Sequence, residues 1–206
     1  MSELKQAHWD SVYEKKSATE VSWYEAYPAK SLYLIRESGL QLTDPIIDVG
    51  GGASLLVDAL LDAGYRNLTV LDLSAEALQR VRDRLGVRAR LVHLLSRDVT
   101  TFLPDRAYAL LHDRAVFHFL TQREDRERYV KVLRQALRPN GYAIIATFGP
   151  NGPERCSGLS VARYDADSLA AELGDGFILV ETSLEVHRTP WDAEQQFLYC
   201  RFRRQG

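Results

Sequence analysis

The sequence contains only two cysteines, Cys156 and Cys200, and no apolar run approaching the roughly 20 residues that a bilayer-spanning helix needs. Two cysteines make neither a disulfide framework nor the ligand spacing of a metal site, so we expect free thiols and no bound metal. The first ten residues lack the basic and then apolar pattern of a secretory signal. We therefore expect a soluble, cytoplasmic protein without a membrane partner.

The sequence also lacks an excess of either charge. Lysine and arginine number 26 and aspartate and glutamate 28, which gives a net charge of -2. No basic stripe interleaved with aromatic residues stands out, so nucleic acid is not expected as a partner. A chain of 206 residues with 46% hydrophobic content can build one full core. We predict a single domain over 1–206, in which a helical appendage or lid over 1–40 precedes a core over 41–206.

Strand-like and helix-like segments alternate along this core. Apolar runs predict strands at 45–50, 68–74, 89–95, 108–113 and 142–148, with apolar residues at helical spacing between them. Such alternation is typical of right-handed crossover units, which build a parallel sheet with helices on both faces. The runs 177–187 and 195–202 have no helix between them and predict an antiparallel hairpin at one edge. The expected fold is an α/β, doubly wound, Rossmann-like and mostly parallel sheet of seven strands.

Two helix starts carry explicit signals. Ser74 can cap a helix that Gly86 would end, because a serine hydroxyl accepts an amide of the first turn and glycine suits the residue after the last. Thr121 and Glu124 have the spacing of a capping box and predict a helix that ends before Pro139.

A glycine-rich turn follows the first predicted strand. The run Asp48-Val49-Gly50-Gly51-Gly52-Ala53-Ser54 lies between that strand and a helix, at the edge where ligands bind in open α/β sheets. Glycines let the backbone approach a ligand without an intervening Cβ. On its own the pattern is weak, because a plain turn also uses glycine.

Aspartates at the next two strand ends strengthen the signal. Asp72 ends the second strand, where a carboxylate can accept hydrogen bonds from ribose hydroxyls. Asp98 follows the third strand, where it can accept from an adenine amino group. Either aspartate alone could be a helix cap or a solvated loop residue. Three such features at successive strand ends predict an adenosine-binding site.

These segments carry a family resemblance. IIDVGGGAS, LTVLDLS, SRDVT and LRPNGYAIIATF, in this order over residues 40–150, resemble the motifs of class I S-adenosylmethionine-dependent methyltransferases. The resemblance implies S-adenosylmethionine as the cofactor. It places Asp48, Gly50 and Gly52, with Gly51 between them, at the methionine moiety, and Asp72 at the ribose. It places Leu73 against the adenine and Asp98 and Val99 at the adenine edge.

The chain departs from that pattern at one glycine. The family often has glycine where Ser54 stands, although serine can cap the following helix there. A dinucleotide-binding turn, the other nucleotide pattern with this context, would need glycine at position 55, which is Leu55. We therefore do not expect a nicotinamide enzyme.

Residues on the acceptor side are expected after the fourth strand. His112, Asp113 and Arg114 are the catalytic candidates, with His112 as general base and Arg114 binding an anionic acceptor or the cofactor carboxylate. An ion pair between Asp113 and Arg114 is the structural alternative. Trp23, with Tyr24, is expected over the cofactor sulfonium, because aromatic faces attract cations; packing of the N-terminal helix onto the sheet is the structural alternative for both. Substrate contacts are expected from three residues, which are Tyr24, Arg155 and Cys156.

The N-terminal segment bears on the acceptor. HWDSVYEKK and the later WYE resemble both small bacterial methyltransferases that modify small molecules and protein-lysine methyltransferases with a WDxxY opening. In the lysine group an acidic residue and then lysine follow the fourth strand, where this chain has Asp113 and Arg114. This difference favours a small-molecule acceptor. A protein-lysine acceptor, and a non-catalytic cofactor-binding or regulatory partner protein, stay open. The oligomeric state is not fixed by the sequence.

Overall fold

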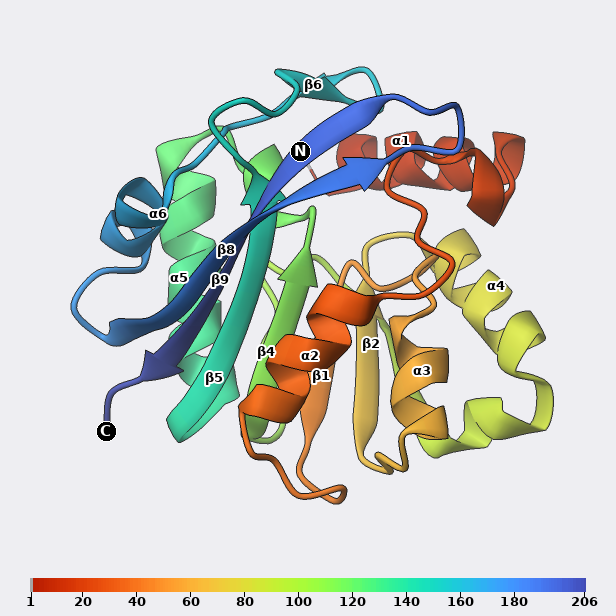
Figure 1. The fold of residues 1–206 in the computed structure, drawn as a ribbon. Helices are drawn as coiled ribbons and strands as arrows, with labels where there is room; N and C mark the ends of the chain where they lie inside the picture. Colours follow the sequence, from red (N-terminus) through yellow and green to blue (C-terminus); the bar gives the residue numbers. More distant parts are fainter. Residues whose placement is uncertain (1) are drawn as a thin grey trace.

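The computed structural model describes residues 2–206, except the side chains of residues 2–4 and 18. Its main sheet has seven strands in the order β3-β2-β1-β4-β5-β9-β8 (Figure 1). The first five strands along the chain are parallel, and β9 pairs antiparallel with both β5 and β8. This confirms the predicted fold and its terminal hairpin. The strands are β1 (Ile46–Val49), β2 (Leu68–Asp72), β3 (Val92–Ser96), β4 (Tyr108–Arg114), β5 (Leu137–Phe148), β8 (Phe177–Arg188) and β9 (Glu194–Arg204).

Helices cover both faces of the sheet. On one face an apolar layer joins the strands to α5 (Arg123–Ala136) and α6 (Ala166–Leu173). On the other face a second layer joins them to α2 (Ala29–Glu37), α3 (Leu56–Asp62) and α4 (Ala75–Leu85) (Figure 1). Both layers form because alternate residues of each strand point to opposite faces.

The N-terminal helix α1 (Ser2–Lys15) belongs to neither layer. It lies above the carboxyl ends of the parallel strands, beside α4 (Figure 1). A short 3-10 turn, η1 (Ala18–Glu20), and an extended segment lead from α1 down to α2. The appendage is therefore placed where it can cover a ligand bound at the strand ends.

Local signals were informative to different degrees. The Ser74 hydroxyl accepts from the Ala77 amide at 3.1 Å, and α4 ends at Gly86 with φ +54°, as predicted. The predicted Thr121 capping box is wrong. The Thr121 amide donates to Phe119 O in a tight turn that follows the 3-10 helix η3 (Phe117–Phe119), and α5 begins after Gln122 without a side-chain cap.

Three further features differ from the predictions. Strand β5 begins at Leu137, five residues before the expected start at 142. The 3-10 helix η2 (Gly86–Leu91) takes up the start of the expected third strand. The loop after β5 forms a small hairpin of β6 (Arg155–Cys156) and β7 (Leu159–Ser160), which the sequence pattern did not indicate.

Candidate functional site

A cavity of about 340 Å³ lies between the carboxyl ends of the strands and helix α1. Its volume is in the range of small-molecule sites, about 300–1,000 Å³. The strand-end wall includes seven residues, which are Val49, Gly50, Leu71, Asp72, Leu73, Asp98 and Val99. The opposite wall includes Lys5, Trp9, Tyr13, Trp23, Phe119, Leu159 and Ser160. The adenosine residues expected at the second and third strand ends therefore all face one cavity.

Asp72 connects this wall to the glycine turn. One carboxylate oxygen, Oδ2, accepts from the Gly52 amide at 3.0 Å, and Oδ1 accepts from the Ser74 amide at 2.8 Å. Burial raises the Asp72 pKa to about 6, although the bonds from Ser74 and Gly52 act to lower it. Because a carboxylate offers about four acceptor positions, Asp72 can still accept hydroxyl donors from the cavity.

The glycines of the turn have no room for a side chain. Gly50 has φ +67°, and a Cβ there would lie 2.1 Å from Cγ2 of Val116. A Cβ on Gly52 would lie 2.4 Å from the Ala77 Cβ and 2.7 Å from Oδ2 of Asp72. Gly50 lines the cavity, so the backbone there is bare toward a ligand. The Ser54 hydroxyl accepts from the Leu56 amide at 3.0 Å, but the N-cap of α3 is Leu55 without a side-chain cap, so the expected cap at Ser54 is wrong.

Asp48 lies beneath the turn and outside the cavity lining. Its Oδ1 is 2.7 Å from Nδ1 of His112, whose Nε2 is 2.9 Å from Oγ of Ser31. The second oxygen, Oδ2, is buried without a hydrogen-bond partner in the described part of the chain and lies where a Gly51 Cβ would be. Asp48 therefore supports the glycine turn from below.

His112 is correspondingly placed away from the cavity. It is buried, and both ring nitrogens are occupied by Asp48 and Ser31. A general base must come within hydrogen-bond reach of the proton it takes. The geometry gives the expected base role no support, and we propose that His112 orients Asp48.

Asp113 faces the other side of the sheet. Its Oδ1 accepts from the Val116 amide at 2.9 Å and the Phe117 amide at 3.3 Å, and Oδ2 accepts from the Tyr129 hydroxyl at 2.7 Å. Burial raises its pKa to about 6. These bonds hold the turn around Ala115, which has φ +70°. We propose that Asp113 shapes the cavity floor without touching a ligand.

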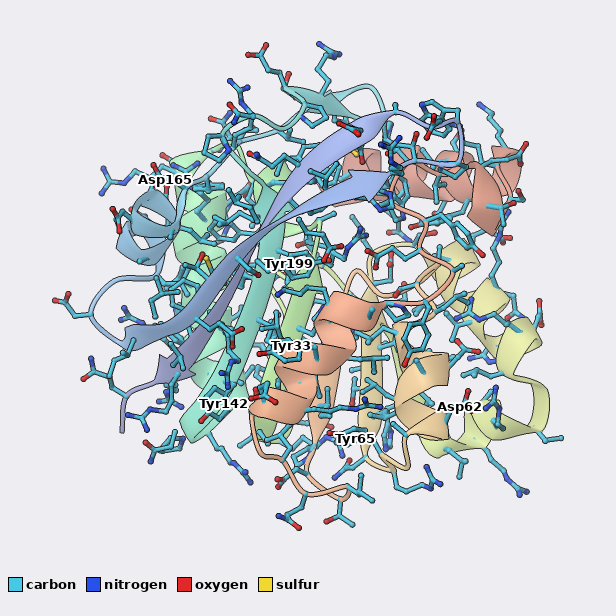
Figure 2. All side chains as sticks on the ribbon, in the orientation of Figure 1. Tyr33, Asp62, Tyr65, Tyr142, Asp165 and Tyr199 are labelled. Atoms are coloured by element: carbon cyan, nitrogen blue, oxygen red, sulfur yellow. The ribbon has the colours of Figure 1, made fainter. Side chains whose placement is uncertain are left out.

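Arg114 lines the cavity and is held by several partners. Its guanidinium pairs with Glu25 at 2.9 Å and donates to Trp23 O at 2.8 Å. It also donates to the hydroxyl of Tyr199 on β9 at 2.9 Å (Figure 2). Its guanidinium also lies 4.5 Å from the ring centre of Phe197. Its ion pair is thus with Glu25 and not with Asp113, and it ties the segment around Trp23 to β4 and β9.

Aromatic rings form the wall opposite the strand ends. The ring centres of Trp9 and Trp23 are 5.9 Å apart, those of Trp9 and Phe119 5.0 Å, and those of Tyr13 and Trp23 6.4 Å. Only Trp23 of this group was predicted to face the site. Trp9 and Tyr13 are four residues apart, so they share one face of α1, and this spacing could have revealed them.

The expected substrate contacts lie elsewhere. Tyr24 faces a separate outer groove together with Tyr27 and Pro190. Arg155 is exposed and donates to Gly158 O, and Cys156 is buried with its sulfur 3.8 Å from Oγ of Ser22. The hairpin that carries them instead contributes Leu159 and Ser160 to the cavity.

The segment after β3, where the adenine is expected, forms one end of the cavity. Asp98 and Val99 both line it, and Asp98 Oδ1 accepts from the amide and the hydroxyl of Thr100 at 2.9 and 2.7 Å.

Among the described residues no cluster of three or more His, Cys, Asp or Glu could hold a metal ion. Over the same part of the chain, no helix combines the length and apolar character needed to cross a membrane.

The strands follow the order of a methyltransferase sheet, and a glycine turn with a facing carboxylate lies at their carboxyl ends. These features place the protein in the class of α/β proteins that bind a nucleotide cofactor. Residues 47–145 match the family described as "Methyltransferase domain". A solved structure of Burkholderia thailandensis 1,6-didemethyltoxoflavin-N1-methyltransferase, with bound 1,6-didemethyltoxoflavin and S-adenosylhomocysteine, superimposes with a TM-score of 0.69 at 19% identity, covering 100% of this chain and 87% of that one.

Two curated relatives are similar at the sequence level. Human EEF1A lysine methyltransferase 2 is 24% identical over 199 residues, which is 84% of this chain and 74% of that protein. The eEF1A lysine and N-terminal methyltransferase of Mus musculus is 23% identical over 120 residues, which is 57% of this chain. The match spans only 17% of the length of the mouse protein. Residues 47–145 are therefore a methyltransferase domain with the class I fold, and S-adenosylmethionine is the cofactor that such a domain uses.

The side chains present fit this cofactor. Asp72 retains acceptor positions for ribose hydroxyls, and the bare backbone at Gly50 leaves room that a side chain would fill. The aromatic wall of Trp9, Tyr13 and Trp23 suits a sulfonium, because the face of an aromatic ring attracts a cation by about 0.5–2 kcal/mol.

Proposed function

We propose that this protein transfers the methyl group of S-adenosylmethionine to a small-molecule acceptor whose nucleophilic atom carries a free lone pair at neutral pH. The acceptor would occupy the part of the cavity enclosed by Trp9, Trp23, Phe119 and the β7 residues Leu159 and Ser160. The strand-end wall would hold the adenosine, with Asp72 at the ribose and Asp98 and Val99 at the adenine.

The protein residues would act mainly by alignment. The cofactor, when bound, supplies a methyl group already activated by its sulfonium. The protein has to hold donor and acceptor in line and exclude water, and good orientation can contribute about 7–11 kcal/mol to the barrier. Trp9 and Trp23 close the cavity from above, and Arg114 fixes Trp23 through its carbonyl. These contacts would keep the acceptor on one line of approach.

One observation carries the choice of acceptor. Among the described residues that line the cavity, the carboxylates are Asp72 and Asp98, both on the adenosine side, and no histidine is present. Lys5 is the charged lining residue on the α1 side of the cavity, and Arg114 is the charged lining residue at the end of β4. Among these lining residues a protonated amine would find no carboxylate outside the adenosine side and no histidine to act as general base, whereas a neutral nucleophile needs neither an opposite charge nor proton removal.

A lysine side chain of a protein is the second candidate acceptor. It is favoured by the similarity to human EEF1A lysine methyltransferase 2, which extends over 199 residues of alignment. For such an acceptor the outer groove of Tyr24, Glu25 and Tyr27 would have to guide the chain toward the cavity. A non-catalytic role as a cofactor-binding or regulatory protein is the third alternative.

Incubation with methyl-labelled S-adenosylmethionine and a cell extract separated by size distinguishes the three. We expect label in the small-molecule fraction, and none there with the D72N variant, because an amide in place of the carboxylate removes an acceptor for ribose hydroxyls. Label in protein bands would replace the small-molecule proposal by lysine methylation. Absence of label from both fractions, with intact cofactor binding, would leave the non-catalytic role.

A further inference from the structure

The lid helix is joined to the ribose-side carboxylate through a single residue, Ser74. The Ser74 hydroxyl donates to Oδ1 of Asp10 on α1 at 2.5 Å. The Ser74 amide donates to Oδ1 of Asp72 at 2.8 Å. Ser74 is fully buried, and its hydroxyl also accepts from the Ala77 amide as the cap of α4. Asp10 on the lid helix and Asp72 in the cavity therefore both accept a hydrogen bond from Ser74.

We propose that Asp10 is a positioning residue that couples closure of α1 to the orientation of Asp72. The inference rests on S-adenosylmethionine as the cofactor and is independent of the acceptor. A hydrogen bond from a hydroxyl to a carboxylate is short and strong, so Asp10 fixes the rotamer of Ser74. A fixed Ser74 holds the first turn of α4, and with it the amide that orients Asp72.

The hydrogen bond between Ser74 and Asp10 also positions the aromatic wall of the cavity. Trp9 precedes Asp10 in the chain, and Tyr13 lies one turn further along α1, so both rings move with the Asp10 contact. When Asp10 is bonded to Ser74, the rings lie over the cavity and Asp72 is turned toward the glycine turn. Cofactor bound at Asp72 would stabilise the bonded arrangement, and withdrawal of Asp10 would loosen both walls together.

Two other contacts hold α1 without reaching Asp72. Lys5 pairs with Asp125 of α5 at 2.9 Å, and Arg80 of α4 donates to Lys16 O at 2.6 Å. Arg80 joins the same two parts of the chain as the Asp10 contact, but its bond lies at the surface and goes to a backbone carbonyl just past the end of α1, and its other partner is Glu76 of its own helix. It therefore provides a matched control for a general loosening of the lid.

The first measurement is the affinity and release rate of S-adenosylhomocysteine, followed by the tryptophan fluorescence of the full chain in stopped flow. We expect D10A to weaken binding about tenfold, with most of the loss in the release rate. D10N, which retains an acceptor oxygen, should recover part of the loss, and R80A should change affinity by less than about twofold. Equal losses in D10A and R80A would overturn the proposal.

The second measurement separates an effect through Asp72 from a simple anchor. 5′-Methylthioadenosine and its 2′,3′-dideoxy analogue differ only in the ribose hydroxyls. We expect the loss caused by D10A to be present with the first and absent with the second. The same loss with both ligands would show that Asp10 only anchors the lid and would overturn the coupling. If the wild-type chain bound none of these ligands, the cofactor assignment itself would fail, whatever the acceptor.

Discussion

Asp48 and His112 face each other across the neighbouring strands β1 and β4, and their side chains are joined over 2.7 Å beneath the glycine turn. Ser31 of α2 closes the other end of the imidazole at 2.9 Å. The three groups are buried and have no opening to the cavity lining. The order Ser-His-Asp resembles a hydrolytic triad, but here it serves as a support that links α2, β4 and β1.

The first prediction concerns that support. H112L should lower the free energy of unfolding by about 3–5 kcal/mol, because it leaves the buried Asp48 carboxylate without its donor. S31A, which removes only the outer partner, should cost about 1–2 kcal/mol. Urea unfolding of both variants measures this difference. A variant at His112 that kept full stability but lost turnover would restore its role as general base.

The second prediction is a pH dependence of cofactor affinity. In the proposed site the ribose hydroxyls would donate to the ionised form of Asp72, and the pKa of this carboxyl is raised to about 6 by burial. The Kd for S-adenosylhomocysteine should therefore rise about tenfold per pH unit as the pH falls below about 6, and level off above it. Calorimetry at several pH values checks this. In D72N the affinity should be weaker, and this step should disappear.

Asp72 has an opposite effect on the free energy of unfolding. Its folded pKa of about 6 lies above the unfolded value of about 3.9, so the folded state holds a proton that the unfolded state releases. Stability from this group should fall as the pH rises through this window. Asp113 has a similarly raised pKa and adds to the same trend. Its side chain does not line the cavity, so it should not contribute to the pH dependence of binding.

The third prediction concerns the glycine turn. In G52A the new Cβ would meet both the Ala77 Cβ and the Asp72 carboxylate, so either α4 or Asp72 must shift. We expect cofactor affinity to fall by at least about tenfold, because Asp72 loses its orientation. G39A is the matched control, since Gly39 has φ +66° with open space around it. That variant should cost about 1 kcal/mol of stability and leave the affinity unchanged. Unchanged affinity in G52A would contradict the role of the turn.

The fold and the cofactor wall could be predicted for the same physical reason. Parallel strands bring their carboxyl ends to one edge, so residues that are distant in sequence, such as Gly50, Asp72 and Asp98, must meet there. Apolar periodicity fixed the number of strands and the terminal hairpin, because each face of the sheet needs its own apolar layer. Boundaries that depend on local turns, such as the start of α5, were misplaced, and the small hairpin of β6 and β7 was missed.

The acceptor side was less predictable because neighbours in sequence were taken as neighbours in space. His112 and Asp113 lie on a strand, where successive side chains point to opposite faces. His112 therefore contacts Ser31 of α2, and Asp113 contacts Tyr129 of α5. Of these three candidates only Arg114, at the strand end, reaches the cavity. Trp23 and Tyr24, which lie in a turn and not on a strand, also divide between the cavity and the outer groove. The position of α1, which supplies Trp9 and Tyr13, depends on tertiary contacts that no local pattern contains.

Titration calorimetry of the wild-type chain and of D72N with S-adenosylhomocysteine at pH 7.5 tests the central claim most directly. The claim is that Asp72 and the glycine turn form the adenosine half of the cofactor site. We expect micromolar binding by the wild-type chain and a loss of about 2 kcal/mol or more in D72N, since a hydrogen bond to a charged acceptor contributes about 1.5–3 kcal/mol. Wild-type binding that D72N left unchanged would show that the adenosine lies elsewhere and would contradict the account.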